Sequence, residues 1–216
     1  MKKLCCLGAI ALLATLANPL TARDSVAPNP NPPPSEIAVL LDFKGDYSEL
    51  SVEQMKREFT SIMKPSGIAF TWQDLKEFRV GTDFPALVVV RFRGNCDLSG
   101  MRPLQHQPGA FAFAHVSDKQ VMPFIEVNCD QIRGSLFAAM WGEDFEYRDF
   151  LLGRAIARVL AHEMHHVLGN TCEHQKHGLA KEALSGRDLI SEALPDAFRG
   201  HTFTIRPSTD FQNKTF

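Results

Sequence analysis

The chain has 216 residues, and its acidic and basic side chains nearly balance, giving a formal net charge of −2 at pH 7. No basic block is present, which argues against nucleic acid or a charged membrane surface as a partner. Residues 36–216 contain no second linker and no internal repeat, so we expect one domain with one sizeable hydrophobic core.

Residues 1–22 have the features of a secretory signal peptide. Lys2 and Lys3 form a basic start, and the apolar run Leu4–Leu16 that follows is too short to span a bilayer. Ala22 is one of several small residues that offer a cleavage site. No later apolar stretch is long enough to cross a membrane. We therefore expect a secreted or periplasmic protein without stable membrane insertion after signal removal.

Residues 23–35 form a Pro-rich tether in front of the domain. Five prolines fall within the nine residues Ala27–Ser35, a composition that favours polyproline II and disfavours packing into a core. A spacer is the favoured interpretation, and a ligand for a Pro-binding module is the alternative.

The first half of the domain alternates between predicted strands and one predicted helix. Ile37–Phe43 is a buried type of strand, and Ser51–Gln54 is a capping box that starts a helix running to residues 65–67. Ile68–Trp72 is a short strand. Ala86–Phe92 is the strongest strand, since its continuous β-branched residues suit the centre of a sheet.

The second half adds two strands and the longest helix. Phe111–Val116 and Pro123–Val127 are predicted strands, a long helix is expected from about Tyr147 to Gly169, and a short helix begins near Ser185. We read the glycine at position 134 as a turn. The order of elements predicts an α/β (α+β) domain in which a mixed, twisted sheet packs on helices.

Three cysteines remain after signal removal. Cys96 and Cys129 each follow a predicted strand of the same sheet, and neighbouring strand ends can approach closely. Because export favours disulfides, we predict a Cys96–Cys129 bond. Cys172 is then left unpaired, and metal ligation is one explanation for an exported free thiol.

A metal-binding motif is predicted at residues 162–166, which read H-E-x-x-H inside the apolar long helix. His162 and His166 are four residues apart, so their imidazoles project from one helix face and can bind one Zn²⁺. Glu163 lies where a carboxylate can accept a proton from a metal-bound water. A surface pair of histidines with a solvated glutamate is the alternative. Clustering argues against it, because five of the eight histidines fall within residues 162–177.

With Gly169, these residues extend to H-E-x-x-H-x-x-G, and the chain resembles the zincin metallopeptidases, in particular the metzincins. The resemblance implies a zincin-like fold across Ile37–Gly169, with a mixed sheet before the active-site helix. The chain departs from the metzincin pattern in two ways. The position of the third ligand falls on Cys172 in place of His or Asp, and no methionine follows Met164, so a Met-turn is absent.

Several residues after Gly169 are candidates for the third zinc ligand. We favour His174, because a neutral imidazole gives the charge balance expected for activating water, with Cys172 second and His177 third. A gluzincin-like site would instead use Glu182 or Glu192 on a later helix.

The resemblance implies a secreted zinc-dependent endopeptidase that acts on peptide or protein substrates. Glu163 would serve as general base, and an edge strand near Phe111–Val116 would bind an extended peptide by strand addition. The alternative is a catalytically inactive zincin-like protein that binds metal or a partner.

Overall fold

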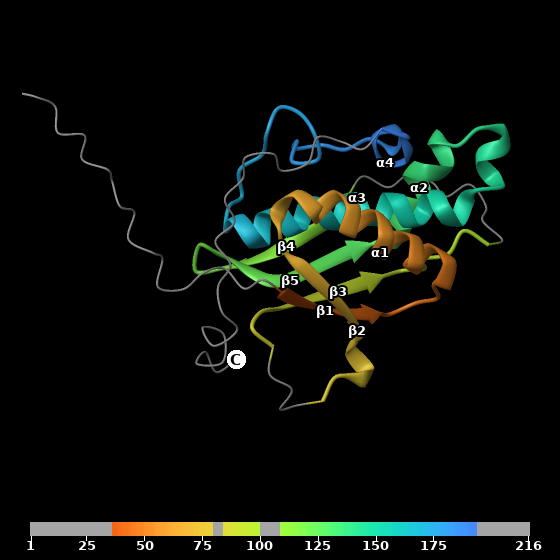
Figure 1. The fold of residues 1–216 in the computed structure, drawn as a ribbon. Helices are drawn as coiled ribbons and strands as arrows, with labels where there is room; N and C mark the ends of the chain where they lie inside the picture. The colour runs from red at the N-terminus through yellow and green to blue at the C-terminus, as the bar shows by residue number, and fades with distance from the viewer. Residues whose placement is uncertain (1–35, 80–83, 100–108, 194–216) are drawn as a thin grey trace, which may run out of the picture. The chain divides into compact units, whose positions relative to one another are not determined.

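The computed structural model describes residues 36–79, 84–99 and 109–193, so the predicted signal peptide and Pro-rich tether lie outside the described residues (Figure 1). The elements follow in chain order: β1 (Glu36–Phe43), α1 (Glu49–Met63), η1 (Lys64–Ser66), β2 (Ala69–Asp74), η2 (Leu75–Glu77), β3 (Leu87–Arg93), β4 (Ala112–Ser117), β5 (Gln120–Asn128), α2 (Cys129–Ala139), η3 (Gly142–Phe145), α3 (Arg148–Gly169) and α4 (Gly186–Ile190).

The strands form one five-stranded mixed sheet in the order β2-β1-β3-β5-β4. β3 lies at the centre, as its sequence predicts, and β1, β2, β3 and β5 run parallel. β4 pairs antiparallel with β5 and forms one edge of the sheet. The expected mixed α/β class is therefore confirmed, and within the described part of the chain no strand pairs with the outer side of β4.

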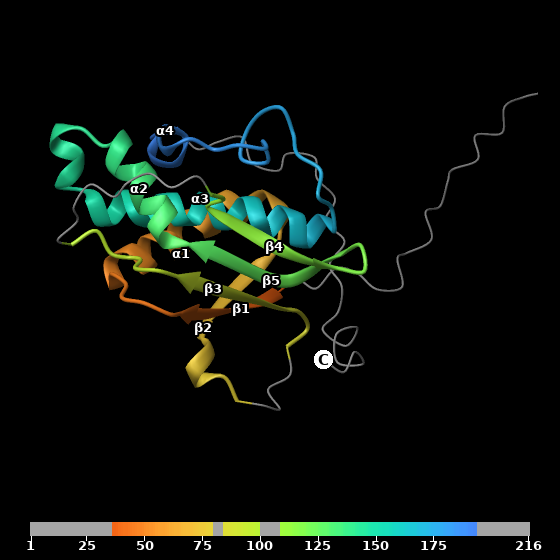
Figure 2. The same cartoon turned by 180° about the vertical axis from the view of Figure 1, so that it is seen from behind.

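The helices pack against one face of this sheet, where Figures 1 and 2 show α1 and α3 lying across the strands. Alternate residues of the strands point into this layer, because successive side chains of a strand face opposite sides. The core is made of these side chains and the apolar stripe of α3, and includes Ile37, Val39, Val88, Val90, Phe92, Ile125, Leu152, Ile156 and Leu160. α3 is thus held rigidly against the sheet.

The start of α1 differs from the prediction. Ser48 is the N-cap and accepts the backbone N–H of Ser51, so Ser51 lies inside the helix and starts no capping box. The Ser51 hydroxyl instead donates to the Asp149 carbonyl at 3.0 Å, joining α1 to the start of α3. At Gly153 the two helices approach so closely that a Cβ atom would lie 2.7 Å from Cβ of Gln54. The sequence alone carries no sign of this tertiary contact.

α2 is a helix that the sequence reading missed. Gly134, read as a turn, lies inside this helix, whose burial of Ile132 and Leu136 outweighs the weak helix propensity of glycine. The predicted disulfide is confirmed. Cys96 and Cys129 are bonded, with Cα atoms 5.0 Å apart, and link the chain after β3 to the first turn of α2.

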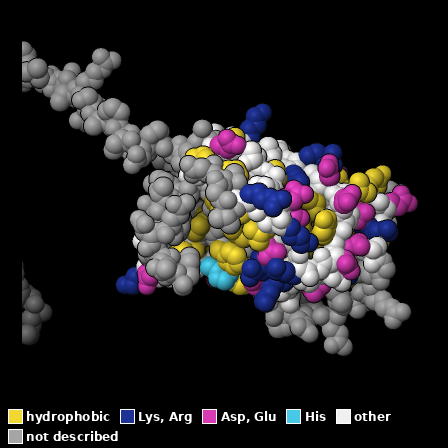
Figure 3. All heavy atoms as spheres, turned by 90° about the horizontal axis from the view of Figure 1, so that it is seen from below, with side chains coloured by type: hydrophobic (Ala, Val, Ile, Leu, Met, Phe, Trp, Pro, Cys, Tyr) yellow, Lys and Arg dark blue, Asp and Glu magenta, His cyan; other side chains and the backbone are white. Residues whose placement is uncertain are grey.

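The opposite face of the sheet carries ion pairs among apolar side chains (Figure 3). Asp42 contacts Arg91 at 3.0 Å and Lys44 at 2.8 Å, and Arg93 contacts Glu126 at 3.0 Å. Among the described helices, none is long and apolar enough to span a bilayer.

Candidate metal centre

His162 and His166 are buried and lie on one face of α3, where their Nε2 atoms are 3.1 Å apart. The helix ends at Gly169, and Asn170 follows with a left-handed backbone, φ 44°. The side-chain oxygen of Asn170 accepts the N–H of Val121 at 3.0 Å, which fixes this turn to the sheet. The chain therefore reverses directly beside the two imidazoles.

The reversed chain brings His174 to the same point. The ring centroid of His174 lies 5.2 Å from that of His162 and 4.8 Å from that of His166. One donor atom of each of the three residues lies within 4.8 Å of the others. Zinc–nitrogen bonds of about 2.0–2.1 Å need tetrahedral donors only slightly more than 3 Å apart, so a small closing movement suffices. These three histidines can hold a metal ion.

The other nitrogen of each helix imidazole is already engaged. Nδ1 of His162 lies 2.6 Å from the Leu179 carbonyl oxygen, and Nδ1 of His166 lies 2.8 Å from that of Thr171. Because a carbonyl only accepts, Nδ1 carries the proton in both rings and Nε2 is left with its lone pair. Such outer hydrogen bonds orient metal-binding histidines and raise their basicity toward the metal. The residues present therefore fit a metal site.

Burial keeps these imidazoles neutral. Desolvation lowers the pKa of His162, and it lowers the pKa of His166 to about 4, assisted by the neighbouring His162. Both rings are consequently uncharged at neutral pH, with Nε2 free of a proton, which is the state that binds metal.

Glu163 lies beside the three histidines, on the side that faces the edge strand β4. Its Oε2 accepts the backbone N–H of Ala114 on β4 at 2.8 Å, and its Oε1 is 4.0 Å from Nε2 of His162. Burial raises the pKa of the carboxyl to about 7, although the Ala114 hydrogen bond acts in the opposite direction. A carboxyl with this pKa can both accept and return a proton near neutral pH.

The remaining ligand candidates lie outside the converging group. Cys172 is exposed and Glu182 is exposed, and both line the adjacent cavity. Among the described residues, the cluster consists of His162, His166 and His174. It does not include Cys172, Glu182, His177 or Glu192.

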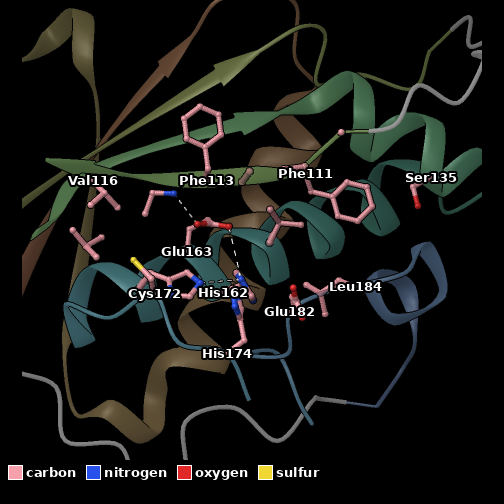
Figure 4. A pocket seen from close by; sticks show the side chains of 18 residues that line it. Phe111, Phe113, Val116, Ser135, His162, Glu163, Cys172, His174, Glu182 and Leu184 are labelled. Carbon is pink, nitrogen blue, oxygen red and sulfur yellow. Dashed lines mark hydrogen bonds and ion pairs between the residues drawn. The ribbon is translucent and has the colours of Figure 1, made fainter. Parts of the chain in front are cut away.

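The metal centre lies in an open cavity of about 600 Å³ between β4, α3 and the segment that follows α3 (Figure 4). β4 contributes Ala112, Phe113, Ala114 and Val116, whereas residues 172–184 form the opposite wall. The position of Ala114, whose N–H points to Glu163, places the free edge of β4 along this cavity.

Arg158 holds α4 and the residues that follow it, beyond the loop that carries His174, and no motif in the sequence pointed to it. Its guanidinium is fully buried and contacts Glu58 at 3.2 Å. It also donates to the Asp188 carbonyl at 2.7 Å, the Ser191 hydroxyl at 3.0 Å and the Ala193 carbonyl at 3.1 Å. An arginine within the apolar stripe of the long helix was the available signal. The stretch from the end of α3 to residue 193, which includes α4, is thus anchored to α3 at both ends.

No protein-family model matches the chain, and no curated protein matches it significantly. A functional assignment therefore depends on the chemistry of the site.

Proposed function

We propose that this protein is a secreted zinc-dependent endopeptidase of the zincin type, acting on peptide or protein substrates. One observation carries the proposal: three imidazoles converge at one point, and the buried Glu163 carboxyl lies next to them without joining the group. A purely structural metal site has no use for a buried carboxyl held beside its ligands and outside their number.

His162, His166 and His174 would hold the zinc ion. When bound there, zinc supplies Lewis acidity and lowers the pKa of a bound water to about 7. Glu163 would accept a proton from the attacking water and deliver it to the leaving amine nitrogen. The Ala114 N–H keeps this carboxylate oriented toward the cavity.

The edge of β4 would bind the substrate. In the β4–β5 pair, the Phe111 carbonyl accepts the N–H of Asn128, while the N–H of Ala114 points the other way. Ala112 lies two residues before Ala114 in the same strand, so its backbone N–H and C=O also point away from β5. The backbone groups of both residues therefore face the cavity. An extended peptide adding to this edge would run past Glu163, with specificity coming from pockets for its side chains.

The test combines metal analysis with cleavage of a mixed peptide library. Wild-type protein should hold about one zinc per chain and cleave peptides, and a chelator should abolish cleavage. Glu163→Gln should keep the zinc. Its rate of peptide cleavage should fall by about 10²-fold or more, as expected for the loss of a general base. Glu192→Gln, an exposed carboxylate outside the cavity, is the matched control. Full activity of Glu163→Gln would refute the mechanism.

A second function, binding of metal or a partner without hydrolysis, is favoured by one feature. The metzincin-like spacing places Cys172 where a third ligand is expected, and its thiol lines the cavity. Stoichiometric zinc without cleavage of any library peptide would support this alternative.

A further inference from the structure

The cavity extends beyond the metal centre toward Phe111, Leu184 and Glu182. Figure 4 shows these three residues on one side of His162, with Val116 and Cys172 on the other. Phe111 comes from the chain before β4, while Glu182 and Leu184 come from the loop before α4. This half of the cavity is therefore formed by two segments that are far apart in sequence.

Its walls are largely apolar. Phe111 and Leu184 are half-buried, and Val159 of α3 is buried at 2% exposure. Such walls take a long aliphatic stem favourably, because apolar surface leaves water on binding. An apolar stem alone, however, does not account for Glu182.

Glu182 is the feature that stands out among these walls. The described residues that line the cavity include no lysine or arginine, and their only carboxylates are those of Glu163 and Glu182. Glu163 is engaged by Ala114, and the neighbouring Lys181 is paired with Asp188 at 2.8 Å. Glu182 makes no ion pair with a described residue, and it lies outside the three-histidine cluster. Among the described residues, therefore, no cation competes with a ligand for this carboxylate, which lines the cavity.

We propose that this half of the cavity is a specificity pocket for a side chain with an aliphatic stem and a cationic end, lysine or arginine, and that Glu182 selects the charge. The proposal rests on the peptidase function and names its substrate class. A carboxylate attracts a cation more strongly beside low-dielectric walls than in open water. Because Glu182 is exposed, the effect is smaller than for a buried pair, and a preference of about twofold to fivefold is expected.

The experiment compares paired peptides that differ only in lysine against norleucine, which has the same stem without the charge. Each pair varies a single position, and different pairs cover the positions before and after the cleaved bond. Wild type should show a lysine-to-norleucine ratio in kcat/KM of about two to five at one position. Glu182→Gln should bring that ratio close to one, and Glu182→Lys should bring it below one, so that norleucine is preferred to lysine. Glu192→Gln is the matched control and should keep the wild-type ratio.

A second measurement separates failure of the pocket from failure of the peptidase function. The zinc-loaded Glu163→Gln variant is titrated calorimetrically with the same lysine and norleucine peptides. If the protein cleaves the peptides and Glu182→Gln has the same lysine-to-norleucine ratio as wild type, the specificity pocket is overturned. The peptidase function is then still supported. Absence of cleavage together with tighter binding of the lysine peptide overturns the peptidase and supports the pocket. Loss of zinc from Glu182→Gln would make Glu182 a ligand and overturn its role in specificity.

Discussion

The backbone N–H of Ala114 on β4 donates a hydrogen bond to the Glu163 carboxyl on α3, across 2.8 Å. The proposed peptide-binding strand, β4, is thus in direct contact with Glu163, the proposed general base. The sheet edge therefore sets the orientation of Glu163, and its N–H partly offsets the effect of burial on the carboxyl pKa.

The first prediction concerns pH. Burial raises the pKa of Glu163 from 4.5 to about 7, so the folded, metal-free protein keeps a proton that the unfolded chain releases in this range. The stability from this group is complete below its unfolded pKa and is lost as pH rises toward 7. Glu163→Gln removes this loss. The stability of the variant relative to wild type should therefore rise with pH.

Urea unfolding with chelator present, across this pH range, measures the difference. His162 and His166 titrate in both proteins, so their contributions cancel when the two stabilities are subtracted. Two stability curves that stay parallel would contradict the raised pKa of Glu163.

The second prediction concerns the third ligand. The imidazole of His174 converges with those of His162 and His166, whereas the thiol of Cys172 is outside the cluster. His174→Ala should weaken zinc binding by more than about 100-fold, because losing a ligand costs more than the 10–100-fold loss typical of an outer partner. Cys172→Ser should bind zinc nearly as wild type. Competition with a chromophoric chelator gives both affinities, and the reverse ranking would assign Cys172.

The third prediction concerns Arg158. Arg158→Met removes the close partner of Glu58, which then keeps only the longer contact with Arg154 at 3.9 Å, and a broken buried ion pair costs about 3–5 kcal/mol of unfolding free energy. Freeing α4 and the residues after it should also weaken zinc binding, since the segment between α3 and α4 carries His174. Calorimetry and chelator competition measure the two effects.

The matched control for Arg158 is the double variant Arg158→Met with Glu58→Gln, which removes both charges. This variant should recover part of the lost stability and not the zinc affinity, because the carbonyls of residues 188 and 193 still lack their donor. Recovery of both properties together would show that Arg158 acts only through charge.

Local patterns predicted much of the fold. The β-branched run now in β3 marked the centre of the sheet, and Ser185 with Asp188 caps the short helix that was expected to begin near Ser185. The start of α1 and the whole of α2 were not predicted. These depend on which surfaces meet in space, as where Ser51 bonds to Asp149, and not on helix propensity.

The candidate site divides in the same way. His162, Glu163 and His166 were predicted because helical spacing alone places them together. The choice among residues 172–192 stayed open, since the path of that loop is set by distant contacts. The Leu179 carbonyl on His162 and the Ala114 N–H on Glu163 are backbone groups, which leave no trace in the sequence.

The Cys96–Cys129 bond has a consequence for how the cleft is assembled. The two cysteines are 33 residues apart, and β4 lies between them, so the wall that would hold a substrate is part of a covalent ring. Closing a ring of this size removes unfolded-state freedom worth about 3–4 kcal/mol. A newly made chain with both thiols reduced would already have the histidine helix but a less firmly held wall. Oxidation of one cysteine pair would therefore be the step that completes the mature cleft.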